Sequence, residues 1–198
     1  MTRLFVFARH GESVLNLERR VNGDPDRDVP LTELGEEESR RLGQQVSQLP
    51  LDACVHTRFP RTRETAELAV AERDDVPLLV EPLLDDIQIG ELDGAAIDEY
   101  RAWKRAHARS DPFPGGESLD DAARRYAEGF RTLLASEHRC VLVVCHEIPI
   151  RYALNGASGS DSLDGPAHEL ANAVPYIFDE EALERAVAGI LRVVKIAA

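Results

Sequence analysis

The sequence predicts an α/β fold: a three-layer α/β/α sandwich with a mostly parallel central sheet and a small lid over the carboxyl ends of the strands. Short apolar runs that suit buried strands alternate along the chain with longer segments of helical periodicity. The 198 residues have the length of one domain, and no internal repeat or linker divides them. We therefore expect residues 1–198 to form a single domain.

In the first half of the chain, the opening strand is the apolar run 3–8, followed by a loop over 12–30 that is rich in Asn, Gly, Asp and Pro. Thr32 suits the N-cap of a helix that ends near Gln48, because several glutamates load its first turns. The remaining elements expected in this half are a strand over 51–56, a helix over 60–72 and a strand over 76–81.

In the second half, helical periodicity covers 97–108 and 118–135, and the segment "DPFPGGE" separates the two helices. The run 139–146 is the most strongly apolar strand in the chain. We expect two further strands, near 175–180 and near 189–197. This alternation of strands and helices favours a parallel sheet with helices on both faces.

Composition and charge argue against several classes of partner. A formal net charge of −13 repels polyanions, so we expect no nucleic-acid partner. No run of apolar residues is long enough to cross a membrane, and the three cysteines are an odd number set in apolar stretches. We therefore expect a cytoplasmic protein with reduced thiols and no membrane association.

Ionisable residues follow four of the predicted strands. The first strand ends at Arg9 and His10, the second leads into Arg61, the third into Asp86, and the strongest ends at His146, with Glu147 next to it. Because ligands in open α/β sheets bind beyond the carboxyl ends of the strands, we expect these side chains to meet. Arginines, histidines and carboxylates together have the composition of a phosphoryl-transfer site.

Other catalytic signatures fail on inspection. No phosphate-binding P-loop is present, and "GASGS" over 156–160 lacks the last glycine of the G-x-S-x-G motif. Ile150 stands where a zinc-binding H-E-x-x-H motif needs its second histidine. A calcium loop beginning at Asp24 would need glycine at Val29 and glutamate at Gly35. We therefore expect no metal and no cofactor.

The remaining groups suit attack on phosphorus by a neutral imidazole. Two guanidiniums and a second, protonated imidazole would stabilise the charge on the phosphoryl oxygens. A carboxylic acid would protonate the leaving oxygen, and burial or a neighbouring carboxylate must raise its pKa so that it keeps its proton near neutrality.

Motifs over nearly the whole chain resemble, in the same order, those of the histidine phosphatase superfamily, which includes the cofactor-dependent phosphoglycerate mutases. The first is "ARHGES" with Asn16 downstream. The others are "DVPLTELGEEES" (28–39), "RTRETAE" (61–67), "DIQIGELDG" (86–94), "GGES" (115–118) and "VVCHEIPIR" (143–151).

This resemblance implies a role for each matching residue. His10 is the histidine that is transiently phosphorylated, and Arg9, Arg61 and His146 hold the phosphoryl group, with Asn16 assisting. Gly11 would let the backbone approach the phosphate closely.

Three residues depart from the family's first-branch pattern. Asp86 stands where that branch usually has a glutamate as proton donor, and Thr62 replaces the usual alanine after Arg61. Glu147 replaces the usual glycine after the second histidine, and in this it is similar to the acid phosphatases and phytases of the other branch, which place their proton donor at or just after this position. Asp86 and Glu147 therefore compete for the role of proton donor, and we favour Asp86 because the order of segments is that of the first branch.

These features together predict a phosphomonoester hydrolase that acts through a phosphohistidine on a small phosphorylated metabolite. Phosphohistidine in a protein is another possible substrate. One alternative is a cofactor-dependent phosphoglycerate mutase, although family mutases are typically longer. A second alternative is a non-catalytic sensor of a phosphorylated ligand. The sequence identifies neither the substrate nor the oligomeric state.

Overall fold

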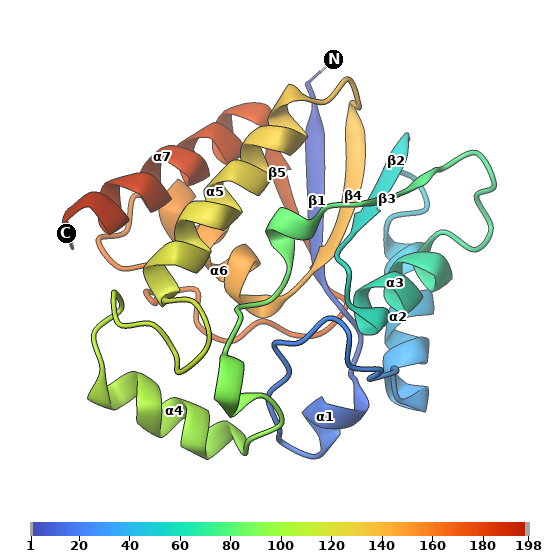
Figure 1. The fold of residues 1–198 in the computed structure, drawn as a ribbon. Helices are drawn as coiled ribbons and strands as arrows, with labels where there is room; N and C mark the ends of the chain where they lie inside the picture. The colour runs from blue at the N-terminus through green and yellow to red at the C-terminus, as the bar shows by residue number, and fades with distance from the viewer. Residues whose placement is uncertain (1, 197–198) are drawn as a thin grey trace.

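A computed structural model describes residues 2–196 (Figure 1). Five strands form one sheet in the order β3-β2-β4-β1-β5. Their bounds are β1 (Leu4–Arg9), β2 (Ala53–His56), β3 (Leu78–Val80), β4 (Cys140–Cys145) and β5 (Pro175–Asp179). The first four strands run parallel, and β5 pairs antiparallel with β1. The predicted α/β fold with a mostly parallel sheet is confirmed.

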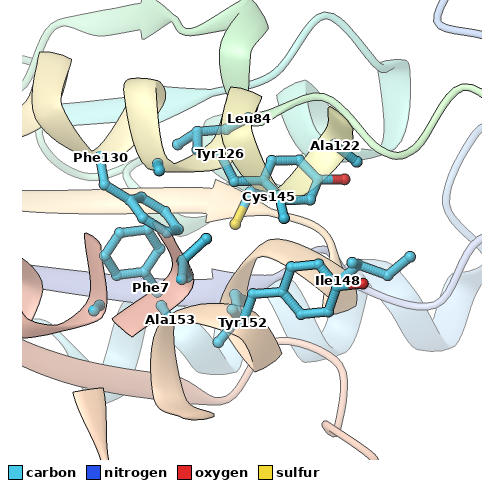
Figure 2. Close-up of a cluster of buried hydrophobic side chains, with 14 of the residues drawn as sticks. Phe7, Leu84, Ala122, Tyr126, Phe130, Cys145, Ile148, Tyr152 and Ala153 are labelled. Carbon is cyan, nitrogen blue, oxygen red and sulfur yellow. The ribbon is translucent and has the colours of Figure 1, made fainter. Parts of the chain in front are cut away.

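Helices cover both faces of the sheet, as predicted. On one face lie α2 (Glu33–Gln45) and α3 (Pro60–Ala69), and on the other lie α5 (Leu119–Ala135), α6 (Glu147–Ala157) and α7 (Glu180–Ile196). Successive side chains of β1 serve the two faces in turn. Val6 packs on the α2/α3 side, whereas Phe7 packs on the other side, edge-on against Phe130 of α5 (Figure 2).

The strand predicted near 189–197 is wrong, because residues 189–196 belong to α7 and residue 197 lies outside the described residues. The β-branched residues Val193 and Val194 resemble a strand when read alone. Over a longer stretch, however, Leu183, Ala186 and Ile190 are buried at helical spacing and pack into the core. The apolar face of the helix therefore outweighs the local strand preference.

Helix α6 follows β4 directly and was not predicted as an element. Pro149 sits in its first turn, where a missing backbone N–H breaks no helical bond. Tyr152 and Ala153 are fully buried, and the helix is buried on nearly every side, its polar residues Arg151 and Asn155 included. His146 is the N-cap residue and Glu147 the first helical residue. The strand-to-helix junction thus fixes both side chains.

The elements at the carboxyl ends of the parallel strands form the lid (Figure 1). They are α1 (Val14–Leu17), α4 (Ile97–Ala106) and the short 3₁₀ turn Gly90–Leu92, whereas the 3₁₀ turn Pro82–Leu84 packs against α5. Backbone hydrogen bonds tie the two lid segments together, from Val21 N to Ala95 O at 3.0 Å and from Gly94 N to Val21 O at 2.9 Å. The long loop and the segment around α4 therefore form one cover over the sheet edge.

Within residues 2–196, no helix combines the length and the apolar character needed to span a bilayer. The three cysteines are unbridged and buried. Cys140 and Cys145 lie on opposite faces of the sheet, since they pack in different core clusters.

Candidate active site

His10 lies just beyond the carboxyl end of the central strand β1. Its backbone N donates to Cys145 O at 3.0 Å, and Asn172 Nδ2 donates to His10 O at 2.7 Å. Its ring Nδ1 lies 2.7 Å from Gly11 O, and Arg61 Nε lies 2.9 Å from Nε2. Because a carbonyl only accepts and a guanidinium only donates, Nδ1 carries the hydrogen and Nε2 carries the lone pair.

The environment of His10 keeps its imidazole neutral. Only 3% of the residue is exposed. Burial lowers the pKa of His10 well below its ordinary value of 6.5, and the charges of Arg61 and Arg9 lower it further, against a smaller opposing effect of the bond to Gly11. The ring therefore has an unprotonated Nε2 near neutral pH, as a nucleophile requires.

Arg61 is the central cation of the site. Pro60 begins α3, and Arg61 follows it, buried with its guanidinium 4.3 Å from the centroid of the Phe59 ring. Burial lowers the pKa of Arg61 from 12.5 to about 10, so it stays charged near neutral pH. Its Nη1 and the Nε of Arg9 are buried donors that have no hydrogen-bond partner within residues 2–196. Such donors suit the oxygens of an anion.

His146 lies behind Arg61, with its ring centroid 5.5 Å from that of His10. Arg61 Nη2 lies 3.1 Å from His146 Nδ1, and the hydroxyl of Thr57 lies 3.0 Å from Nε2. Burial lowers the pKa of His146 well below 6.5, and the charge of Arg61 lowers it further. Full burial beside a guanidinium therefore favours the neutral ring in this arrangement, whereas the sequence analysis expected a protonated imidazole beside a phosphoryl group.

Asp86 reaches the same cluster from the loop after β3. Its Oδ2 accepts from Arg61 Nη2 at 3.0 Å and lies 3.4 Å from His146 Nδ1. Burial raises the pKa of Asp86, although Arg61 opposes this effect. The preceding Asp85 is buried and bonds to both the backbone N and the guanidinium of Arg58, which fixes the loop beside α3.

Glu147 has a different environment. Its Oε2 lies 3.1 Å from Arg9 Nη1, and its Oε1 lies 3.2 Å from Arg151 Nη1. Arg151 in turn pairs with Asp164 at 2.9 Å. Both carboxylate oxygens of Glu147 are therefore engaged by guanidiniums in an alternating chain of charges that begins at Arg9.

Asn16 and Gly11 contribute through local backbone structure. Asn16 Oδ1 accepts from Ser13 N at 3.2 Å within the capping box of α1, so its NH₂ group is the part that can face an anion. A Cβ at Gly11 would lie 2.3 Å from Gly35 O. Close packing against α2 therefore requires glycine at position 11.

One cleft of about 1120 Å³ joins most of these groups. It is lined by Arg9, His10, Asn16, Arg61, Asp86 and Glu147. His146 is fully buried behind Arg61. Exposed arginines from the lid, Arg19, Arg20, Arg101 and Arg105, line the outer part. The cleft is thus rich in cations although the whole chain is acidic.

The sequence analysis did not identify several residues that support this site. Asn172 holds the backbone of His10, Thr57 holds His146, and Arg151 holds Glu147. Arg151 had a readable signal, since it follows Glu147 by four residues on one helix. Asn172 had none, because it lies in an irregular segment whose path depends on the tertiary fold.

Comparisons with known proteins agree with this geometry. Residues 5–188 match the family model of the histidine phosphatase superfamily (branch 1). A 2,3-bisphosphoglycerate-dependent phosphoglycerate mutase 2 of Gloeobacter violaceus is 32% identical over 193 residues, covering 90% of this chain and 86% of that protein.

Two solved structures share the fold. The YhfR protein of Bacillus stearothermophilus superposes with a TM-score of 0.77 at 27% identity, covering 88% of this chain and 89% of the other. A putative α-ribazole-5′-P phosphatase of Escherichia coli superposes with a TM-score of 0.78 at 20% identity, covering 90% and 91%. On the strength of the family model, which spans nearly the whole sheet and all of the clustered groups, the chain belongs to branch 1 of the histidine phosphatase superfamily.

Proposed function

We propose that this protein hydrolyses the phosphomonoester of a small metabolite through a phosphohistidine at His10. One observation carries the proposal: the lone pair of a neutral His10 Nε2 lies beside buried guanidinium nitrogens that have no protein partner, Arg61 Nη1 and Arg9 Nε. A phosphoryl group placed there would give these donors their acceptors and the imidazole its electrophile.

The reaction takes two displacements. In the first, His10 Nε2 forms a bond to phosphorus while the bond from phosphorus to the ester oxygen breaks, and Asp86 gives its proton to the departing alkoxide. In the second, Asp86 as carboxylate takes a proton from water, the water oxygen bonds to phosphorus, and the P–N bond breaks. His10 returns to its neutral form and Asp86 to its acid form.

The environments of the two acids support Asp86 as the donor. Burial raises the pKa of Asp86, which favours the protonated form that a general acid needs. Both oxygens of Glu147 are engaged by the guanidiniums of Arg9 and Arg151. We therefore assign Glu147 to the orientation of Arg9.

The guanidiniums of Arg9 and Arg61 bind the phosphoryl oxygens in this proposal, and His146 acts on them from behind Arg61. The negative charge of a phosphoryl group would oppose the effect of Arg61 on the pKa of His146. The ring could then gain a proton at Nδ1 and donate it in a hydrogen bond towards the reacting group.

Hydrolysis is favoured over transfer by the exposure of the cleft. Exposed side chains such as Arg20 and Arg105 line its outer part, so water reaches the phosphohistidine unless a substrate excludes it.

Phosphoglycerate mutase activity is the second candidate, since the Gloeobacter violaceus relative carries that name. The expected length difference does not separate the two candidates, because the matched segment covers nearly equal shares of both chains.

The test is a screen of phosphorylated metabolites with wild type and His10→Asn side by side. The proposal predicts phosphate release by the wild type only. Conversion of 3-phosphoglycerate that depends on added 2,3-bisphosphoglycerate would favour the mutase. Binding of vanadate with no turnover of any monoester, p-nitrophenyl phosphate included, would favour a sensor.

A further inference from the structure

We propose that Thr57 and Thr62 are positioning residues whose hydroxyls form a one-directional hydrogen-bond relay to His146. The relay holds the His146 ring in the tautomer with its hydrogen on Nε2, so that the Nδ1 lone pair faces Arg61 and Asp86. Its consequence for turnover rests on the proposed function, whereas the tautomer itself does not.

One end of the relay is fixed by a carbonyl. Thr62 Oγ1 lies 2.8 Å from Phe59 O and 3.3 Å from Thr57 O, and both of these oxygens can only accept. A hydroxyl has a single hydrogen, so Thr62 has none left for the Thr57 hydroxyl at 2.8 Å. Thr57 must therefore donate to Thr62, and it can only accept from His146 Nε2 at 3.0 Å.

The other end faces a guanidinium. Arg61 Nη2 lies 3.1 Å from His146 Nδ1, and a guanidinium has no acceptor to offer. The two hydrogens of Nη2 also have Asp86 Oδ2 at 3.0 Å and Asn22 O at 3.3 Å as acceptors. The contact therefore agrees with a lone pair on Nδ1, and the threonine end is the one that assigns the tautomer.

Burial makes this assignment costly to reverse. Thr57 is 1% exposed, and Thr62 and His146 are fully buried, so solvent cannot replace a lost partner. The opposite tautomer would turn His146 Nδ1–H towards the guanidinium of Arg61 at 3.1 Å. It would also leave the hydroxyl oxygens of Thr57 and Thr62 2.8 Å apart with no hydrogen between them.

The relay determines where His146 gains a proton. With Nε2 already protonated, the only basic atom of the ring is Nδ1, which lies 3.4 Å from Asp86 Oδ2. The titratable groups that act on the ring are Arg61 of α3, His10, Arg125 of α5 and Arg9 of β1, and Asp86 of the loop after β3 also faces it. A proton taken up by His146 therefore arrives on the side of the reacting group.

Position 62 makes the relay a property of this chain. In the histidine phosphatase pattern that this chain resembles, alanine follows the arginine that corresponds to Arg61. An alanine at position 62 would have no hydroxyl to accept from Thr57, so the Thr57 hydroxyl could rotate. We infer that the Thr62 hydroxyl prevents this rotation, so that all His146 rings have the hydrogen on Nε2 and the lone pair on Nδ1.

The first measurement is the tautomer of His146 in the wild-type protein, by two-bond ¹H–¹⁵N correlation spectra of ¹⁵N-histidine-labelled enzyme. The His146 signals are assigned from their loss in His146→Gln. The proposal expects a protonated Nε2 and an unprotonated Nδ1 at neutral pH. A ring protonated on Nδ1 alone would overturn it without reference to turnover.

The second measurement compares Thr62→Val, which removes the hydroxyl, with Thr62→Ser, which keeps it. Thr62→Val should populate both tautomers and lower kcat by about tenfold, the effect of one lost buried hydrogen bond, with little change in KM. Thr62→Ser should restore both the spectrum and the rate. Thr62→Ala serves the same purpose if Thr62→Val does not fold.

Thr132→Val is the matched control, because this threonine also donates to a backbone carbonyl about one turn earlier, but at an exposed position of α5. It should leave the His146 spectrum unchanged. Equal losses in Thr62→Ser and Thr62→Val would show that packing, and not the hydroxyl, matters. If no variant or wild type turns over any monoester, the proposed function fails while the tautomer result still decides the relay.

Discussion

His10 combines two fixed ring contacts with burial that keeps the imidazole neutral. Arg61 and Gly11 hold its ring from opposite nitrogens, so the nucleophilic atom is oriented before a substrate arrives. In this geometry the cost of ordering the nucleophile is met during folding and not during catalysis.

Removal of that nitrogen gives the first prediction. His10→Asn should fold and should lose kcat by about a thousandfold or more, as removal of a covalent nucleophile does in other hydrolases. Rapid quench with ³²P-labelled substrate should show acid-labile phosphate on the wild-type chain and none on the variant. Labelling of the variant at an equal level would place the phosphoryl group on another residue.

The second prediction separates the two acids by leaving group. Asp86→Asn should lower kcat for an alkyl phosphate by about a hundredfold or more, the range of general acid catalysis, and much less for p-nitrophenyl phosphate, which departs without a proton. Glu147→Gln should lower both rates alike, because it loosens Arg9. The assignment is reversed if only Glu147→Gln shows the dependence on leaving group.

The third prediction concerns pH. Burial raises the pKa of Asp86 and lowers that of His10. With an alkyl phosphate, kcat/KM should fall at high pH as Asp86 loses its proton and at low pH as His10 gains one, so the optimum should lie on the acid side of neutrality. Profiles between about pH 4 and 9 test this, and the alkaline decline should vanish in Asp86→Asn. A wild-type rate that rises steadily to alkaline pH would contradict it.

Most of the residues that meet at the sheet edge could be predicted because each directly follows a strand or begins a helix. The charge state of His146 could not be predicted, because it depends on burial beside Arg61. The role of Glu147 was equally hidden, since its partner Arg9 lies far away in the sequence and meets it only when β1 pairs with β4.

At the scale of elements, periodicity predicted the core of the sheet and failed at the C-terminal segment. Strands β1 and β4 are short and apolar on both faces, a pattern that is typical of buried parallel strands. In α7 the run of β-branched residues suggested a strand, whereas the helix is set by a buried stripe that includes Leu183 and Ile190. This apolar stripe is buried only because α5 and α6 pack against α7, and the local sequence does not show that packing.

The crossing of α6 and α7 gives the fourth prediction. A Cβ at Gly189 would lie 2.2 Å from Gly156 O, so the two helices touch through their backbones. Gly189→Val should lower the free energy of unfolding by about 2–3 kcal/mol through overpacking. Ala188→Val adds the same side chain on the exposed face of α7 and should cost about 1 kcal/mol or less in urea titrations. Equal losses in the two variants would mean that the close crossing does not matter.

At the scale of the whole molecule, the buried neutral histidines couple the site to acid stability. Burial lowers the pKa of His10 in the folded state. As the pH falls below about 6.5, His10 therefore gains a proton in the unfolded chain but stays neutral in the folded protein. Stability is therefore kept above that pH and lost below it, by about 1.4 kcal/mol per pH unit for one such histidine.

The fifth prediction follows from this sign. Between pH 7 and pH 5.5, His10→Asn should lose less unfolding free energy than the wild type, by about 1 kcal/mol. His107→Asn, at an exposed position, should follow the wild-type curve. Urea unfolding at each pH measures the difference, and parallel curves for wild type and His10→Asn would refute the coupling.

The pairing of β1 has a consequence for synthesis of the protein. Among the described residues its ladder partners are β4 and β5, whose first residues lie at Cys140 and Pro175. A nascent chain therefore carries the apolar segment "LFVFA" without a partner until most of the polypeptide has left the ribosome. Such long-range pairing slows folding and leaves an apolar strand exposed to aggregation in the meantime. The strand that presents the nucleophile is therefore also the one that most needs protection by a chaperone.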